Sequence, residues 1–170
     1  MELVGRAKIF ATAAHAAVGQ RRKYSGAPYI VHPVEVMEIV RSVPHTPEML
    51  AAALLHDTVE DTKVTLDLIR SEFGDAVADL VGWLTDPSKP RDGNRAARKA
   101  VDRAHTAAAP AEAQTIKLAD LIANTGSIVE NDPAFAKIYL AEQRALLAVM
   151  ERGDRSLHRH ASELAGCLSG

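Results

Sequence analysis

The sequence predicts an all-α protein, and three observations carry this prediction. Apolar residues recur at helical spacing through nearly all of the 170-residue chain. No window shows the sustained apolar–polar alternation that marks a half-buried strand. Proline and glycine divide the chain into helix-sized segments. A chain of this length is expected to form one domain over residues 1–170.

Each expected helix has a recognisable start, face or end. Pro33 suits the first turn of the second helix, and Thr65 and Asp132 suit N-caps. Gly74 suits a helix end. The segment 47–60 is apolar almost all round, so this helix is expected at the centre of the core. In chain order, the expected helices cover residues 3–17, 33–43, 47–60, 66–73, 75–84, 95–105, 111–129, 133–152 and a short segment after Gly153.

Composition indicates which partners and which cellular compartment to expect. The net charge of −2 gives no reason to expect a nucleic-acid partner. No run of about 18 apolar residues predicts a membrane span, and the N-terminus reads as an amphipathic helix. The single Cys167 cannot form an internal disulfide, which fits a reducing compartment. We therefore expect a cytoplasmic protein with no membrane partner.

The segment LLHDTVEDT, residues 54–62, places one imidazole and three carboxylates directly after an apolar run. His56 and Glu60 are an i, i+4 pair, as are Asp57 and Asp61. The two carboxylates of the second pair repel each other unless a cation or a substrate lies there, and a metal ion is the obvious candidate. The alternative is a solvent-facing helix end with capping carboxylates.

Two further residues gain weight from their order in the chain. His32 stands beside a proline at a helix start, where a surface turn is the simpler interpretation. Asp120 lies among apolar neighbours, where pairing with an arginine or a cap is the simpler one. The order His, His-Asp, Asp on three separate helices favours a shared role for all of them. His15 has no partner at ligand spacing and is interpreted as a surface or core histidine.

Four ordered segments carry a resemblance to a known family: QRRKYSGAPYIVHP, AALLHDTVEDT, FGDAVADLV and IKLAD followed by Asn124. They resemble the hydrolase domain of RelA/SpoT proteins, which belongs to the HD-domain superfamily of metal-dependent phosphohydrolases. The match is best to the stand-alone small alarmone hydrolases, including the metazoan SpoT-like type, and covers about residues 6–128. It implies an HD-domain helical bundle, with residues 133–168 in the same domain.

The resemblance implies the metal site and the catalytic pair. The four residues that match the family's metal ligands are His32, His56, Asp57 and Asp120. Two imidazoles and two carboxylates suit one borderline divalent ion; the family metal is usually Mn²⁺, with Fe²⁺ and Zn²⁺ left open. Glu60 and Asp61 match the pair that positions and activates the attacking water.

The resemblance also implies substrate contacts. Arg22 and Lys23 match basic residues near the family's diphosphate, with Arg21 as an alternative to Arg22, and Asn124 matches a nucleoside contact. The chain departs from the pattern nearby. Leu121 stands where relatives often have a basic residue, and Thr125 and Gly126 stand near the place of an arginine.

The expected function is metal-dependent hydrolysis of the 3′-pyrophosphate of guanosine tetra- or pentaphosphate, giving GDP or GTP and pyrophosphate. No synthetase activity is expected of 170 residues. Two alternatives stay open: hydrolysis of another nucleotide, such as the 2′-phosphate of NADPH, and a non-catalytic metal-bound alarmone sensor. The partner is a small nucleotide; a homodimer is left open, because the apolar stripe after Pro133 suits either a core or a dimer face.

Overall fold

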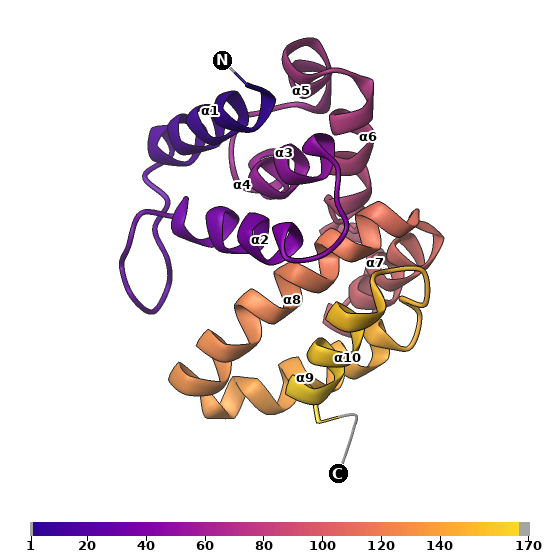
Figure 1. The fold of residues 1–170 in the computed structure, drawn as a ribbon. Helices are drawn as coiled ribbons and strands as arrows, with labels where there is room; N and C mark the ends of the chain where they lie inside the picture. The colour runs from indigo at the N-terminus through magenta and orange to yellow at the C-terminus, as the bar shows by residue number, and fades with distance from the viewer. Residues whose placement is uncertain (1, 167–170) are drawn as a thin grey trace. The chain divides into compact units, whose positions relative to one another are not determined.

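The computed structural model describes residues 2–166, and its regular structure is helical (Figure 1). Within this range the extended pairing is limited to one isolated antiparallel bridge between Arg21 and Pro28. The predicted all-α class is therefore confirmed. Cys167 lies outside the described residues. No helix in the described part of the chain is long and apolar enough to cross a bilayer.

The chain divides into two compact units, one that ends at Thr85 and one that begins at Asp86. The predicted single domain over residues 1–170 stays a prediction. The helices of the first unit are α1 (Leu3–Ala17), α2 (Val31–Arg41), α3 (Pro47–Leu55), α4 (Thr58–Asp61), α5 (Leu66–Phe73) and α6 (Asp75–Leu84).

The helix α3 is the centre of the first unit. The helices α1, α2 and α6 all pack against α3, and α5 packs against α6 (Figure 1). All residues of α3 from Met49 to Leu55 are buried, as its apolar sequence predicts. Its N-cap is Thr46, whose hydroxyl accepts a hydrogen bond from the backbone N–H of Met49. The predicted central helix is thus confirmed.

The predicted length of that helix is wrong, because the chain leaves the helix at His56 and Asp57. The helix α3 ends at Leu55, and the turn formed by these two residues separates it from α4. The Thr58 hydroxyl donates to the carbonyl oxygen of Leu55 at 2.7 Å. A side chain that bonds a terminal carbonyl offers the backbone an alternative to helix continuation. The break places the candidate ligands in a turn rather than on the side of a helix.

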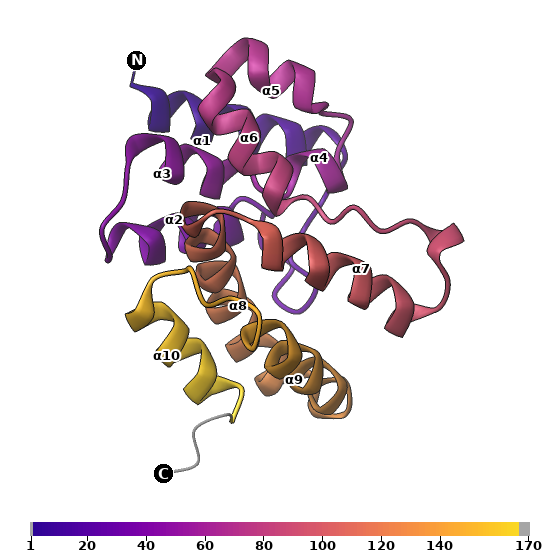
Figure 2. The same cartoon turned by 90° about the vertical axis from the view of Figure 1, so that its right-hand side faces the viewer.

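The second unit is also helical (Figure 2). Its elements are the 3₁₀ turn η1 (Pro90–Asp92) and the helices α7 (Arg95–Ala108), α8 (Ala111–Asn131), α9 (Pro133–Leu147) and α10 (Arg155–Leu164). The long α8 packs against α9 and α10, and α7 packs against α9. The predicted N-caps Thr65 and Asp132 are confirmed, because their side chains accept hydrogen bonds from Leu68 N and Phe135 N.

The helix α9 is shorter than predicted, since it ends at Leu147 instead of about Arg152. The backbone N–H groups of Arg152 and Gly153 donate to Oε1 of the buried Gln114 at 2.9 and 3.2 Å. These groups are therefore used for anchoring to α8 and not for continuing α9. A Cβ at Gly153 would lie 2.6 Å from Cδ1 of Leu118, so a larger residue would collide there.

Candidate active site

Two histidines and an aspartate of the first unit form a candidate metal centre. His32 lies in the first turn of α2, and His56 and Asp57 form the turn after α3. Oδ2 of Asp57 lies 3.1 Å from Nε2 of His56 and 3.6 Å from Nε2 of His32. One ligand atom from each residue lies within 4.8 Å of the other two. The structure thus brings together three of the four predicted metal ligands.

The tautomer of His56 follows from its hydrogen bond. Nδ1 lies 2.7 Å from the carbonyl oxygen of Ala53, so the Nδ1–H group donates there. In the neutral ring, Nε2 then turns a lone pair towards the carboxylate of Asp57. Two such acceptors at 3.1 Å need a proton or a cation between them. Two buried imidazoles and a carboxylate are a donor set that suits a borderline divalent ion, so these residues fit a metal.

Tyr29 supports this centre from outside. Its hydroxyl donates to Oδ2 of Asp57 at 2.6 Å. Its ring lies against those of His15 and His32, with centroids 4.6 and 5.8 Å away. A hydrogen bond to a ligating carboxylate fixes its orientation and tunes its basicity. We therefore assign Tyr29 a supporting role that the sequence analysis missed, although the residue stands within the motif PYIVHP.

The predicted catalytic pair lies on α4, one turn beyond Asp57. Glu60 and Asp61 are both exposed. Nε2 of Gln20 donates to Oδ2 of Asp61 at 3.0 Å. Desolvation raises the pKa of Asp61 above its usual value, the bond from Gln20 opposes this, and the Asp57 carboxylate raises the pKa further. A carboxylate whose pKa is raised is a better proton acceptor, which is what a general base needs.

Arg21 and Arg22, in the basic loop after α1, differ in the contacts of their guanidinium groups. The backbone N–H of Arg22 donates to Ala27 O at 2.9 Å. Arg21 is used within the loop, because its guanidinium donates to Gly26 O at 3.1 Å. The Arg22 guanidinium lies over the Tyr29 ring, 5.9 Å from the centroid, and Tyr29 in turn bonds Asp57. Of the two arginines, Arg22 is therefore the one whose side chain contacts Tyr29, which bonds the candidate metal centre. Lys23 is exposed.

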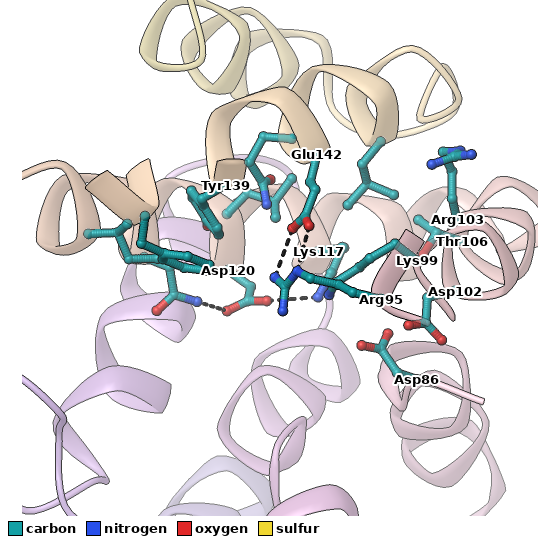
Figure 3. Close-up of a pocket in the computed structure, with 16 residues that line it drawn as sticks. Asp86, Arg95, Lys99, Asp102, Arg103, Thr106, Lys117, Asp120, Tyr139 and Glu142 are labelled. Carbon is teal, nitrogen blue, oxygen red and sulfur yellow. Dashed lines mark hydrogen bonds and ion pairs between the residues drawn. The ribbon is translucent and has the colours of Figure 1, made fainter. Parts of the chain in front are cut away.

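The remaining predicted residues, Asp120 and Asn124, lie on α8 in the second unit. Asp120 is buried, and its two oxygens accept from Lys117 Nζ at 3.0 Å and Asn124 Nδ2 at 2.8 Å (Figure 3). These two residues are joined within their unit. The place of Asp120 as a fourth metal ligand, and that of Asn124 as a nucleoside contact, stay predictions.

Asp120 and Asn124 line a cavity of about 220 Å³ between α7, α8 and α9 (Figure 3). Arg95 forms a two-pronged ion pair with Glu142 at 2.7 and 2.9 Å. The carboxylate of Asp102, which also lines the cavity, accepts two hydrogen bonds from Ser88. Most charges of this cavity are therefore matched by protein groups. The sequence analysis had not identified this cavity.

A family model described as "HD domain" matches residues 7–145, which is most of the chain. The chain belongs to the HD domain family, and the predicted HD-domain fold is confirmed.

Its curated relatives are much longer proteins. The chain is 43% identical over 107 residues to "GTP pyrophosphokinase" of Streptomyces coelicolor, a match that covers 62% of this chain and 12% of the relative. It is 44% identical over 87 residues to "Probable guanosine-3′,5′-bis(diphosphate) 3′-pyrophosphohydrolase" of Synechocystis, covering 51% and 11%. The chain thus spans about a tenth of the length of these two relatives.

A solved structure matches over nearly its whole length. It is described as "A metazoan ortholog of SpoT hydrolyzes ppGpp and plays a role in starvation responses". The match has a TM-score of 0.84 and 26% sequence identity, and it covers 96% of this chain and 94% of the other. The predicted likeness to the metazoan SpoT-like type is confirmed.

Proposed function

We propose that this chain is a metal-dependent hydrolase that removes the 3′-pyrophosphate of guanosine tetra- and pentaphosphate. The observation that carries the proposal is the His32–His56–Asp57 cluster, followed one turn later by the pair Glu60–Asp61. The reaction consumes one water and gives GDP or GTP and pyrophosphate. The similarity to a metazoan protein described as hydrolysing ppGpp supports this choice of substrate.

The ligands in this proposal are His32, His56 and Asp57, with Asp120 as the expected fourth. A divalent ion bound there would polarise the phosphate and lower the pKa of water. We propose Mn²⁺ as the native metal, because the donor set suits it and the family resemblance favours it over Fe²⁺ and Zn²⁺. A homodimer and residence in the cytoplasm stay predictions.

The protein's own groups then move the proton and hold the substrate. Glu60 and Asp61 orient the attacking water, and Asp61 accepts its proton, as its raised pKa favours. The water oxygen forms a bond to the phosphorus next to the 3′ oxygen, and the bond from that phosphorus to the 3′ oxygen breaks. The 3′ oxygen leaves on the nucleotide and takes up a proton. Arg22 and Lys23 neutralise the outer phosphate, and Asn124 contacts the nucleoside.

The test is incubation of the purified chain with ppGpp, with and without Mn²⁺, followed by anion-exchange chromatography. Metal-dependent release of GDP and pyrophosphate in equal amounts, lost in Asp57→Ala, is the expected result. Absence of release from a protein with bound Mn²⁺ would overturn the substrate assignment. Release of phosphate from NADPH in that case would identify the alternative nucleotide substrate.

A further inference from the structure

We propose that His15 and Gln20 are positioning residues that fix the orientation of the Asp61 carboxylate. This inference rests on the proposed function, in which Asp61 accepts the proton of the attacking water. The three residues form one hydrogen-bonded chain within the first unit. Nδ1 of His15 lies 2.7 Å from Oε1 of Gln20, and Nε2 of Gln20 lies 3.0 Å from Oδ2 of Asp61.

The direction of each hydrogen bond is set by the ionised end. The Asp61 carboxylate can only accept, so the amide nitrogen of Gln20 must face it and donate. The amide oxygen of Gln20 then faces His15 and accepts, which assigns the imidazole proton to Nδ1. A reversed amide would place its oxygen against the carboxylate. Both hydrogen bonds therefore run in one direction, from His15 to Gln20 and from Gln20 to Asp61.

The burial of His15 points to a purpose beyond packing. Its side chain is 1% exposed, and its Nε2 has no hydrogen-bond partner within residues 2–166. A buried polar atom in that state costs about 1–3 kcal/mol. A phenylalanine would fill the space without this cost, but it could not donate to Gln20. The histidine is thus explained by the bond that it makes through Nδ1.

The same ring also touches the support of the metal centre. The His15 ring packs against Tyr29, and the Tyr29 hydroxyl bonds Asp57. One side chain of α1 therefore contacts both the residue that orients Asp57 and the residue that orients Asp61. The Asp61 side chain is exposed, and the hydrogen bond from Gln20 restrains the orientation of its carboxylate.

The kinetic test uses Gln20→Met, which keeps length and removes the amide. We expect kcat to fall about 10- to 100-fold, as is usual for the loss of a supporting hydrogen bond, with KM within twofold of the unchanged protein. His15→Leu should lower kcat similarly. His15→Asn should restore much of it, because the amide nitrogen of asparagine takes the place of Nδ1. Thr12→Val, an exposed change on the same helix, is the matched control.

A second measurement tests the hydrogen bonds between His15, Gln20 and Asp61 without the need for turnover. In ¹⁵N-histidine-labelled metal-free protein, long-range ¹H–¹⁵N spectra should show His15 as the Nδ1–H tautomer, and its shifts should move in Gln20→Met and in Asp61→Ala. A Nε2–H tautomer, or a wild-type kcat in Gln20→Met, would overturn the proposal. If the wild type resists proteolysis but cleaves neither ppGpp nor NADPH, the proposed function is overturned instead. The tautomer of His15 would then still test the hydrogen bonds from His15 through Gln20 to Asp61.

Discussion

The two units handle charge in opposite ways. In the first, two imidazoles and a phenol converge on one oxygen atom, Oδ2 of Asp57, with distances of 2.6 to 3.6 Å. In the second, charged groups that line the cavity beside α8 form ion pairs with each other, such as Arg95 with Glu142 and Lys117 with Asp120. The difference is that the first unit has a His-His-Asp cluster compatible with a divalent cation, whereas most charged groups of the cavity in the second unit already have protein partners.

We expect the largest effect on activity from removal of the Asp57 carboxylate, whose Oδ2 atom is shared by the contacts of the first unit. In Asp57→Ala we expect turnover to fall at least about 1,000-fold, because the ligand set loses its charge and its common centre. Mn²⁺ binding, measured by calorimetry, should be lost in parallel. Asp67→Ala, at an exposed site on α5, is the control. Tight stoichiometric Mn²⁺ binding by Asp57→Ala would contradict the assigned centre.

The next effect separates binding of metal from use of water. Glu60→Gln keeps the size of the side chain and removes its charge, so turnover should fall about 100- to 10,000-fold. Mn²⁺ affinity should change little, because Glu60 is not among the assigned ligands. Glu72→Gln provides an exposed control of identical chemistry. Full activity in Glu60→Gln would remove this residue from the mechanism.

A smaller effect distinguishes the two arginines of the basic loop. Arg22→Ala should raise KM for ppGpp about 10-fold through loss of a charge-assisted contact, and the difference should shrink at high salt. Arg21→Ala should raise KM much less, because its guanidinium bonds Gly26 O inside the loop. Equal effects of the two changes, measured in the same assay, would assign the contact to net charge and not to Arg22.

The smallest effect belongs to the second unit. The bond from Arg95 lowers the pKa of Glu142 below its usual 4.5. A lowered folded-state pKa contributes stability that is present above the unfolded value and lost as pH falls through the folded value. Since the Arg95 side chain is 50% exposed, Glu142→Gln should cost at most about 1 kcal/mol at pH 7.

This cost should shrink as pH falls below 4.5 and vanish once the folded-state carboxyl of Glu142 is protonated, as followed by urea unfolding of both proteins. Glu130→Gln, an exposed change on α8, is the control for loss of a carboxylate alone. A cost in Glu142→Gln that stays constant from pH 7 to pH 3 would show that packing, and not charge, holds α7 to α9.

Sequence alone predicted the helical class, the central helix and the three residues that the structure brings together as a His-His-Asp cluster, because periodicity and local motifs report on them directly. It did not predict the break at His56, beside which the Thr58 hydroxyl donates to the Leu55 carbonyl oxygen, because the helical pattern of the sequence continues to Glu60. It also missed the early end of α9, since that requires knowing that Gln114 bonds the chain 38 residues later.

The site shows the same division. The candidate ligands were predicted from the order of histidines and aspartates, but the residues that hydrogen-bond to the site were not. Tyr29 and Gln20 act across 28 and 41 residues of sequence, on Asp57 and Asp61. His15 was interpreted as a surface or core residue, and it is indeed buried. Its hydrogen bond to Gln20 became visible only in three dimensions.

The burial of α3 has a consequence for the lifetime of the site. A helix with no residue exposed between Met49 and Leu55 cannot fray or tilt without opening the core around it. Its amide hydrogens should exchange with solvent only when the whole unit unfolds. His56 and Asp57 directly follow the end of this helix, so we expect their backbone to keep its position until the whole unit unfolds. In α4, only a few residues later, Thr58 is the one buried residue, so the amide hydrogens of this short helix should exchange through its local opening.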